Sequence, residues 1–309
     1  MYITVSICTW NRCDLLEQTL TQMTRAVVPP GLRLEVLVIA NACTDNTEAV
    51  ASSFTGRLPI RTVVEPTPGL SRARNRALAE AQGDYIVFTD DDVLVSEQWL
   101  PSLAEAIFRF PDAAAFGGTI EPWFPVEPDQ DLVEAFPALS LGFCGLDNGV
   151  ELGVLPDDKQ IFGANMAFSV RAVAGLRFNP QFGPVGSSAV NMDEIDFVAR
   201  LRQSGGSVVW VPAMRVQHYV DPKRMTRRYL LKFSRDAGRA WVRFEGIPEG
   251  KRILFPLWLI RQCAKARVSA MVLGVKGKRV ASLEQLRTYS FYLGAALESF
   301  ERSRSSSSP

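Results

Sequence analysis

The chain has 309 residues, enough for one large domain or one domain with an extension, and its 47% hydrophobic content is typical of a globular protein with a sizeable core. Its five cysteines include no C-x-x-C pair and its single histidine is His218, which argues against a disulfide framework, a zinc knuckle or any site built from several histidines. The sequence has no basic N-terminal leader and no apolar run near the roughly 18 residues of a spanning helix, so we expect a cytoplasmic protein.

The formal net charge of +1 conceals two regions of opposite charge. Residues 1–222 hold 15 basic and 27 acidic residues, a net charge of −12. Residues 223–309 hold 19 basic and 6 acidic residues, a net charge of +13. This asymmetry predicts two domains with these bounds, an acidic body and a basic extension that favours an anionic surface or substrate.

The first part of the chain alternates strand and helix patterns. We expect strands at 2–10, 33–40, 60–66, 84–90 and 113–122. Between them we expect helices at 12–27, 43–54, 70–83 and 97–110. The helix at 43–54 should be capped by Thr44 or Asp45, and the helix at 70–83 closed by Gly83. This alternation predicts a parallel, doubly wound α/β sheet.

The second part of the chain is less regular at first. Residues 121–159 are rich in proline, glycine and acid and predict long loops. A strand and a helix are then expected within 159–173, a helix at 190–206 and a strand at 207–220. Beyond Asp221 we expect amphipathic helices at 224–244, 257–274 and 282–300, and a disordered end at 301–309.

Polar loops follow four of the expected strands, at the edge where open α/β sheets bind ligands. The fourth of these loops begins with three adjacent carboxylates, Asp90, Asp91 and Asp92. Because adjacent carboxylates repel one another, the simplest way to stabilise them is a hard divalent cation such as Mg²⁺ or Mn²⁺, which would also bind substrate phosphate. The alternative is a solvated acidic turn that precedes the next helix.

Several motifs, in order, resemble those of family 2 glycosyltransferases with the GT-A fold. They are VSICTWNR, EVLVIANACTDNT, GLSRARNRALAEAQGDYIVFTDDDV, FGANMAF, NMDEIDFVARLRQSGG and VPAMRVQH, which together span about residues 3–220. The resemblance implies a mixed, mainly parallel GT-A sheet in residues 1–222, followed by the C-terminal helical extension. It also implies a metal-dependent, inverting transfer of a sugar from a nucleotide-diphosphate sugar to a hydroxyl acceptor.

By the same resemblance, the acidic strand end carries the metal and the nucleotide. Asp92 is expected to ligate the metal, Asp90 or Asp91 to contact the ribose, and Asp90 to border the metal as well. His218 is expected to add a metal or diphosphate contact, since a neutral imidazole suits Mn²⁺. The alternative for His218 is a hydrogen bond to backbone at a strand end. The metal would neutralise the departing diphosphate.

The resemblance places the catalytic base on MDEIDF. Family members usually carry Glu-Asp-x-Asp here, and the second acid deprotonates the acceptor hydroxyl. In this chain Glu194 takes that position and Asp193 precedes it. We therefore expect Glu194 to be the base, with Asp193 as the alternative, because the swap moves the carboxylate by about one methylene. Asp196 is expected to interact with the helix dipole instead.

Donor contacts are implied for residues at the strand ends and in the adjoining loops. Besides Asp90 and Asp91 they are Thr9, Asn11, Arg12, Asn41, Arg72, Gly163 and Asn165. For Arg74 and Arg76 a solvated helix face is an equal interpretation, and Asp45 is equally a helix cap or a ligand contact. Family members often have Asp where this chain has Ala40, so the contact to uracil is missing or comes from Asn41 or a backbone group. UDP is the first expectation for the nucleotide, and GDP or dTDP are alternatives.

The basic extension mixes Lys and Arg with aromatic and aliphatic residues, a composition that suits helices on an anionic membrane. Packing on the acidic body or a homodimer interface are equal alternatives, and the lack of a recognisable module argues against nucleic acid. In the membrane interpretation the acceptor is a glycan or lipid-linked glycan of bacterial polysaccharide or glycoconjugate synthesis, met at the inner face of the cell membrane.

Two other functions fit part of the pattern. A sugar nucleotidyltransferase also uses an α/β sheet and metal-binding carboxylates, but CTWNRCDLL lacks the glycine-rich loop expected after its first strand. A non-catalytic nucleotide-sugar-binding or scaffold protein fits the altered Ala40 and the Asp-Glu order.

Overall fold

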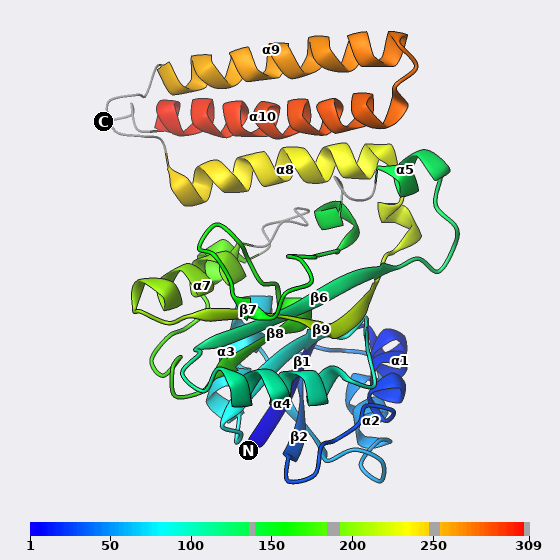
Figure 1. Cartoon of the computed structure of the whole chain (residues 1–309), viewed down its shortest axis with the longest axis vertical. Coiled ribbons are helices and arrows are strands. Elements are labelled where there is room, and N and C mark those ends of the chain that lie inside the picture. The colour runs from blue at the N-terminus through cyan, green and yellow to red at the C-terminus, as the bar shows by residue number, and fades with distance from the viewer. Residues whose placement is uncertain (136–139, 184–191, 247–253, 306–309) are drawn as a thin grey trace. The chain divides into compact units, whose positions relative to one another are not determined.

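The protein is described by a computed structural model of the whole chain (Figure 1), in which residues 1–135, 140–183, 192–246 and 254–305 are described. Two compact units are present, and each is described by itself. The first comprises Met1–Trp123, Gly145–Gly183 and Asp193–Tyr219. Of the described residues, the second holds 124–135, 140–144, 192, 220–246 and 254–305.

The first unit is built on one mixed sheet with the strand order β3-β2-β1-β4-β8-β6-β9-β5, in which β7 also pairs with β9. The strands are β1 Tyr2–Thr9, β2 Arg33–Asn41, β3 Ile60–Glu65, β4 Tyr85–Asp90, β5 Val93–Val95, β6 Ala115–Trp123, β7 Gly153–Val154, β8 Met166–Ser169 and β9 Val208–Tyr219. Strands β3, β2, β1 and β4 are parallel to one another, β8 runs antiparallel to β4 and β6, and β6 is parallel to β9. The expected mixed, mainly parallel sheet is confirmed.

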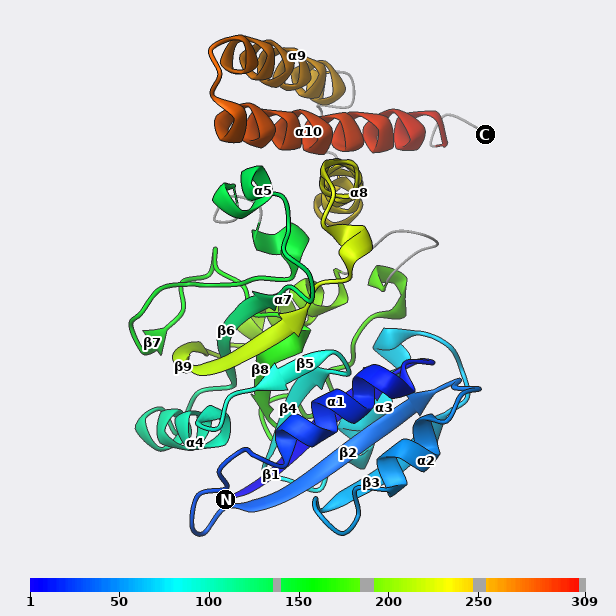
Figure 2. The same ribbon diagram turned by 90° about the vertical axis from the view of Figure 1, so that its right-hand side faces the viewer.

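Helices cover both faces of this sheet (Figure 2). They are α1 Cys13–Met23, α2 Thr47–Ser52, α3 Leu70–Glu80, α4 Trp99–Arg109 and α7 Asp193–Gln203. Val36 and Val38 of β2 pack in one core cluster with α1, α2 and α4, while Leu37 and Ile39 pack in a second cluster with α3 and α7. Successive side chains of a strand point to opposite faces, so a strand that is apolar at every position is buried on both.

The register brings the polar loops together. Thr9 lies beside Ala40, Cys8 beside Asp90, and Asn41 beside Glu65, so β1, β2, β3 and β4 all end at the same edge. Most of the site residues that the sequence predicts at strand ends lie at the carboxyl ends of β1, β2 and β4. This edge is therefore where a site can be assembled.

Three local expectations were wrong. Helix α1 ends at Met23, four residues before the expected end at Val27. Helix α3 ends at Glu80, and Gly83 is not its cap. A Cβ on Gly83 would lie 2.7 Å from the Thr4 backbone nitrogen and 2.8 Å from the Tyr2 carbonyl oxygen, so glycine is needed there because the chain passes close to β1. The helix expected after β8 does not form, since residues 170–175 are turns.

The second unit is helical. Its helices are α5 Gln130–Glu134, α8 Arg227–Glu245, α9 Leu254–Val275 and α10 Arg279–Ser305, with short 3₁₀ turns η1 Ser140–Phe143 and η4 Pro222–Arg224. The remaining turns, η2 Gly163–Asn165 and η3 Pro180–Phe182, belong to the first unit. The three expected C-terminal helices are thus present. Helix α10 reaches Ser305, so part of the end expected to be disordered is helical, and residues 306–309 lie outside the described residues.

Helix α10 packs against both α8 and α9. Glycines allow the backbones of α8 and α10 to touch: a Cβ on Gly238 would lie 1.9 Å from the Phe291 carbonyl oxygen, and one on Gly294 would lie 1.9 Å from the Arg235 carbonyl oxygen. Within the part of the chain that the structure describes, no helix combines the length and apolar character needed to cross a membrane.

Candidate active site

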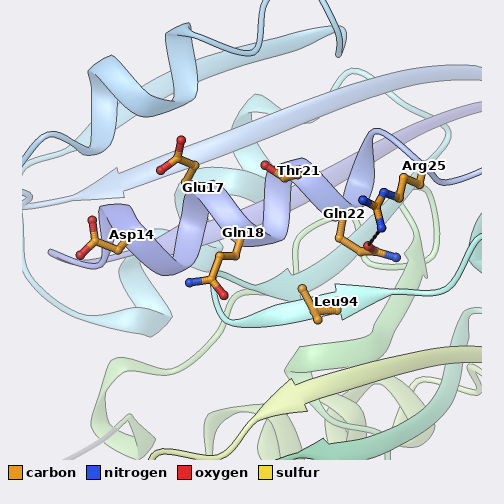
Figure 3. Close-up of a pocket in the computed structure, with 7 residues that line it drawn as sticks. All are labelled: Asp14, Glu17, Gln18, Thr21, Gln22, Arg25 and Leu94. Atoms are coloured by element: carbon orange, nitrogen blue, oxygen red, sulfur yellow. Dashed lines mark hydrogen bonds between the residues drawn. The ribbon is translucent and has the colours of Figure 1, made fainter. Parts of the chain in front are cut away.

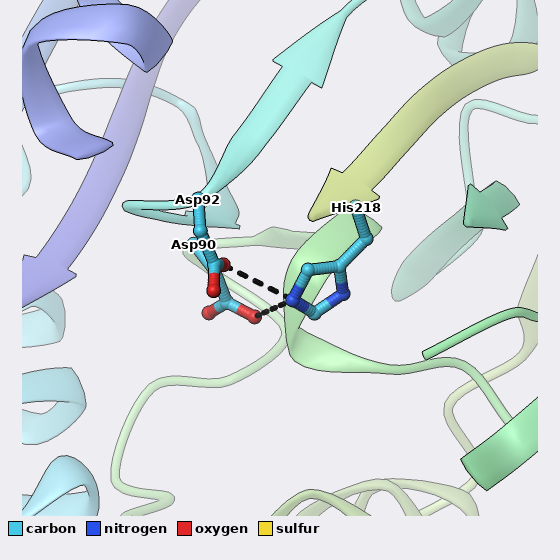
Figure 4. A group of neighbouring side chains, drawn as sticks. All are labelled: Asp90, Asp92 and His218. Atoms are coloured by element: carbon cyan, nitrogen blue, oxygen red, sulfur yellow. Dashed lines mark ion pairs between the residues drawn. The ribbon is translucent and has the colours of Figure 1, made fainter. Parts of the chain in front are cut away.

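An acidic cluster forms where β4 ends and the chain turns back. Asp90 is the last residue of β4, and after Asp92 the chain continues as β5, which runs antiparallel to β9 and pairs Val93 with His218. The His218 Nε2 atom lies 3.0 Å from Asp92 Oδ1 and 3.9 Å from Asp90 Oδ2, so the imidazole points at both carboxylates (Figure 4). The Tyr219 N–H also donates to the Asp92 carbonyl oxygen at 2.9 Å, which fixes this pairing.

The chemistry of this cluster fits a divalent cation. Asp90, Asp92 and His218 each offer one ligand atom, and these atoms lie within 4.8 Å of one another. Asp92 is buried and Asp90 is partly exposed, so a bound ion would keep one side open to substrate. Two carboxylates and one imidazole could hold Mn²⁺ or Mg²⁺, with water or phosphate at the remaining positions.

Asp91 is the odd member of the acidic triplet. It is only 3% exposed, and its carboxylate accepts hydrogen bonds from Thr9 Oγ1 at 2.7 Å and from Arg12 Nη1 at 2.8 Å. Burial and the neighbouring Asp92 raise the pKa of Asp91 to about 6, although Arg12 and Thr9 act against the rise. Asp91 thus holds the end of β1 in place and lies outside the cluster that could bind a cation.

Arg12 links the triplet to the first loop. Its Nη1 atom contacts Asp91 and also Asp92, the latter at 3.0 Å, while 40% of its side chain stays exposed. Burial alone would lower the pKa of Arg12, but the charges of Asp92 and Asp91 raise it, so the guanidinium stays charged. Its exposed part can donate to a phosphate at this edge.

A second cluster of charges lies around Arg74 on α3. Arg74 is 2% exposed, and its Nη1 donates to Asp193 Oδ1 at 2.9 Å while its Nη2 donates to Glu194 Oε1 at 2.6 Å. The remaining oxygens accept from Ser71 Oγ, 2.6 Å from Asp193 Oδ2, and from the Gly163 N–H, 2.9 Å from Glu194 Oε2. Arg74 is therefore a buried ion-pair partner, and the solvated interpretation of it was wrong.

The two acids of this cluster differ in their access to solvent. Asp193 is fully buried, whereas Glu194 keeps 7% of its surface exposed. Burial raises the pKa of Glu194, Arg74 opposes the rise, and Asp193 and Asp90 add to it. The charge of Asp90 also raises the pKa of Arg74, so the two clusters interact electrostatically.

Gly163 belongs to this second cluster because of its size. A Cβ at this position would lie 2.0 Å from Arg74 Nη2 and 2.6 Å from Glu194 Oε1. Any side chain here would displace the ion pair. The GANM segment, where the sequence suggested a donor loop, therefore also makes room for Arg74.

Three asparagines with expected donor roles bond within the protein. Asn165 is 1% exposed and its amide contacts Trp99 Nε1, the Thr119 carbonyl and the Met214 carbonyl at 2.7–3.0 Å. Asn41 bonds to the backbone of residues 65, 67 and 69, which shapes the loop between β3 and α3. Asn11 has a φ of 52° and accepts from the Thr44 N–H at 2.7 Å. These side chains position loops, and they are not gathered in either charge cluster.

The other candidate side chains are also placed. Arg72 is exposed, and Arg76 forms an ion pair with Glu80 one turn later on α3. Asp45 accepts from the N–H groups of Thr47 and Cys13, at 3.1 and 3.0 Å, so it bonds to the first residues of α2 and α1. The N-cap of α2 is Asn46, so the expected cap at Thr44 or Asp45 was wrong. Asp196 pairs with Arg200 on α7. Ala40 is buried in β2.

Sequence reasoning undervalued Ser71 and Arg74, both of which bond to Asp193 in the second charge cluster. They are three residues apart on the α3 face that also buries Ala73 and Ala77. An arginine on the small-residue face of a helix signals a buried charge that needs an acidic partner. That signal was available in the spacing.

An open hollow of about 410 Å³ lies along the outer side of α1 (Figure 3). It is lined by Asp14, Glu17, Gln18, Thr21, Gln22, Arg25 and Leu94. None of these is an expected site residue.

Comparison with known proteins points to one family. Residues 4–126 match the family model described as Glycosyl transferase family 2. The succinoglycan biosynthesis protein ExoM of Rhizobium meliloti is 26% identical over 238 residues, which cover 75% of this chain and 71% of that protein. The glucosyl-dolichyl phosphate glucuronosyltransferase of Haloferax volcanii is 24% identical over 229 residues, 71% of this chain and 69% of that protein.

These similarities support a family 2 glycosyltransferase, with the family model matching the N-terminal part of the chain. The mannosyltransferase PcManGT of Pyrobaculum calidifontis, solved with GDP-Man and Mn²⁺, superposes with a TM-score of 0.62 at 18% identity, covering 99% of this chain and 88% of that one. This similarity shows a shared GT-A fold. The family model and the relatives support a glycosyltransferase enzyme and favour it over the nucleotidyltransferase and the non-catalytic alternatives.

Proposed function

We propose that this glycosyltransferase moves a sugar from a nucleotide-diphosphate sugar to a hydroxyl group of a glycan or lipid-linked glycan, with inversion at the anomeric carbon. The observation that carries the proposal is the pair of charge clusters at the strand ends. One cluster, Asp90, Asp92 and His218, could hold a divalent cation. The other presents Glu194, an acid kept next to a buried arginine.

In this proposal the first cluster receives the diphosphate. Asp92 and His218, with Asp90 at the edge, would hold Mg²⁺ or Mn²⁺, which when bound offsets the negative charge of the leaving diphosphate. Arg12, already fixed by Asp91 and Asp92, donates to a phosphate oxygen through its exposed side. Exposed Arg72 is a second phosphate donor.

We assign the base role to Glu194. Its raised pKa makes it a better proton acceptor than an ordinary glutamate once it is ionised, and the acceptor hydroxyl would give it a proton as it attacks the sugar. Asp193 is the weaker candidate because it is fully buried, whereas Glu194 keeps 7% of its surface exposed. Both oxygens of each acid accept a hydrogen bond, so the bonding does not separate them. We propose that Asp193 anchors Arg74.

We infer the nucleobase of the donor and the nature of the acceptor from the contacts of the β2 end and from similar proteins. Buried Ala40 cannot contact uracil by hydrogen bond and the Asn41 amide is used by the next loop, so a backbone group would have to read the base. UDP remains our first choice, and GDP, the nucleotide of PcManGT, and dTDP are the alternatives. Similarity to ExoM supports a role in bacterial polysaccharide synthesis, and similarity to the glucuronosyltransferase supports a lipid-linked acceptor.

We further propose that residues 1–222 form the catalytic domain and residues 223–309 an extension that places it at the inner face of the cell membrane. The basic character of the extension supports this placement.

Release of nucleoside diphosphate from UDP-, GDP- and dTDP-sugars, with and without Mn²⁺, tests the proposal. Asp92→Asn should lower metal-dependent turnover by at least about 10²-fold and remove the thermal shift given by donor and metal together. Glu194→Gln should keep that thermal shift and lose about 10²–10⁴-fold in transfer.

Exposed Asp112→Asn and Glu105→Gln serve as matched controls that should behave as wild type. The proposal fails if Asp92→Asn and Glu194→Gln turn over at the control rate, or if no nucleotide sugar stabilises the protein.

A further inference from the structure

Helix α9 is apolar on two opposite faces. On one face Leu259 packs with Ala295 and Ala296 of α10, and the Ala270 carbonyl accepts a hydrogen bond from Ser282 of α10 at 2.8 Å. The other face carries five residues that are between 46% and 90% exposed: Leu257, Ile260, Val268, Met271 and Val275. At 3.6 residues per turn these five fall within about 80° of one another. They form a stripe that runs the length of α9 on the side away from α10; we call it the outer stripe.

Basic residues border the outer stripe. Arg261, Lys265, Arg267 and Lys276 are all exposed. No acidic residue occurs from 250 to 283, a stretch that holds eight Lys and Arg. The surface of α9 and of the turn after it therefore combines an apolar stripe with bordering basic residues and no acidic residue; we call these four basic residues the basic rim. One rim member, Arg267, lies with its guanidinium carbon 5.8 Å from the Tyr289 ring centre.

We propose that the outer stripe and its basic rim dock on the surface of a bilayer that contains anionic phospholipid. The apolar stripe matches the boundary between headgroups and acyl chains, and the rim matches the lipid phosphates. Trp258 at the start of α9 is 43% exposed and packs edge-on against Tyr292 at 5.8 Å, a position suited to the interfacial layer. Helix α9 would lie along the membrane plane.

Other occupants fit this face less well. In a two-fold dimer the same patch would meet itself, so the basic rims would face each other without an acidic partner. Nucleic acid would use the rim but leave the outer stripe exposed to water. Only an anionic bilayer satisfies both the apolar and the cationic parts.

The test uses the full-length protein and flotation with vesicles. Vesicles of phosphatidylcholine and phosphatidylglycerol in equal parts should carry the protein, pure phosphatidylcholine vesicles should carry far less, and high salt should release it. Neutralising Arg261, Lys265 and Lys276 together to Gln should lower binding by about fivefold per cation, or about 100-fold in all. A control with Arg25, Arg109 and Arg171 changed to Gln alters the net charge equally on exposed sites of the first unit and should bind as wild type.

A second variant separates the apolar part from the charge. Changing exposed Val268, Met271 and Val275 to Ser keeps every charge and should also weaken binding. Docking is overturned if wild type stays unbound on anionic vesicles, or if both α9 variants bind like the control. It is also overturned if the serine variant abolishes a concentration-dependent dimer in sedimentation while its vesicle binding is unchanged.

Docking deepens the membrane placement of the extension and rests on the proposed function, in which the catalytic unit acts on a lipid-linked acceptor. Donor turnover measured without vesicles distinguishes the two. Loss of flotation with intact turnover overturns docking and the proposed membrane placement of the extension, but leaves the proposed transfer reaction standing. Absent turnover with intact flotation overturns the transfer reaction alone.

Discussion

Gly163→Ala is the sharpest single test of the buried ion pair. The new Cβ would lie 2.0 Å from Arg74 Nη2, whereas real Cβ atoms essentially never approach other heavy atoms closer than 3.0 Å. The guanidinium must therefore move by about 1 Å, away from a Glu194 oxygen that it now contacts at 2.6 Å. Overpacking of this kind costs about 1–3 kcal/mol, and breaking a buried ion pair costs about 3–5 kcal/mol.

The same displacement should reach catalysis. The new Cβ would also lie 2.6 Å from Glu194 Oε1, so that carboxylate must shift together with its arginine partner. If Glu194 is the base, this misplacement should lower turnover by up to about 10²-fold. Urea unfolding gives the change in stability, and nucleoside diphosphate release at saturating donor gives the change in rate.

Gly56→Ala is the matched control, because a Cβ there meets nothing within 4 Å and the backbone is not left-handed. The reasoning is refuted if Gly163→Ala unfolds at the same urea concentration as Gly56→Ala and keeps its turnover.

Three further outcomes are expected. Glu194 must be ionised to accept a proton, and burial raises its pKa, so kcat/KM should fall as pH falls, at a higher pH than for an ordinary glutamate. Arg74→Lys should retain this pH profile better than Arg74→Met. Identical pH profiles in all three proteins would contradict the assignment. Burial acts to raise the pKa of Glu298, but its arginine partners outweigh burial and lower the pKa overall. Ionised Glu298 therefore stabilises the helical unit at pH above the ordinary glutamate pKa, and this stabilisation is lost as pH falls through the lowered pKa. Circular dichroism melts should show this loss in wild type and not in Glu298→Gln. Gly238→Ala should destabilise the α8–α10 contact by about 1–3 kcal/mol in thermal melts, whereas Gly274→Ala, 3.5 Å from its nearest neighbour, should not.

Much of the first unit followed from local patterns in the sequence. Continuous apolar runs such as that of β2 predicted strands buried on two faces, and the alternation with helices predicted the doubly wound sheet. The Asp90–Asp92 triplet was recognisable because it directly follows such a strand. These features depend on neighbours within a few residues, which is the range over which a period of two or of 3.6 residues is visible.

What the triplet does was decided only by tertiary structure. His218 lies next to Asp92 because the chain turns back after β4 and β5 pairs with β9. Asp91 lies outside the cluster because its carboxylate is bonded to Thr9 and Arg12 at the end of β1. Arg74 is buried because α3 and α7 share one face of the sheet, which brings Asp193 and Glu194 to it. Strand order and helix placement set these encounters, and both depend on packing across the whole sheet, so no local period in the sequence reveals which charges will meet.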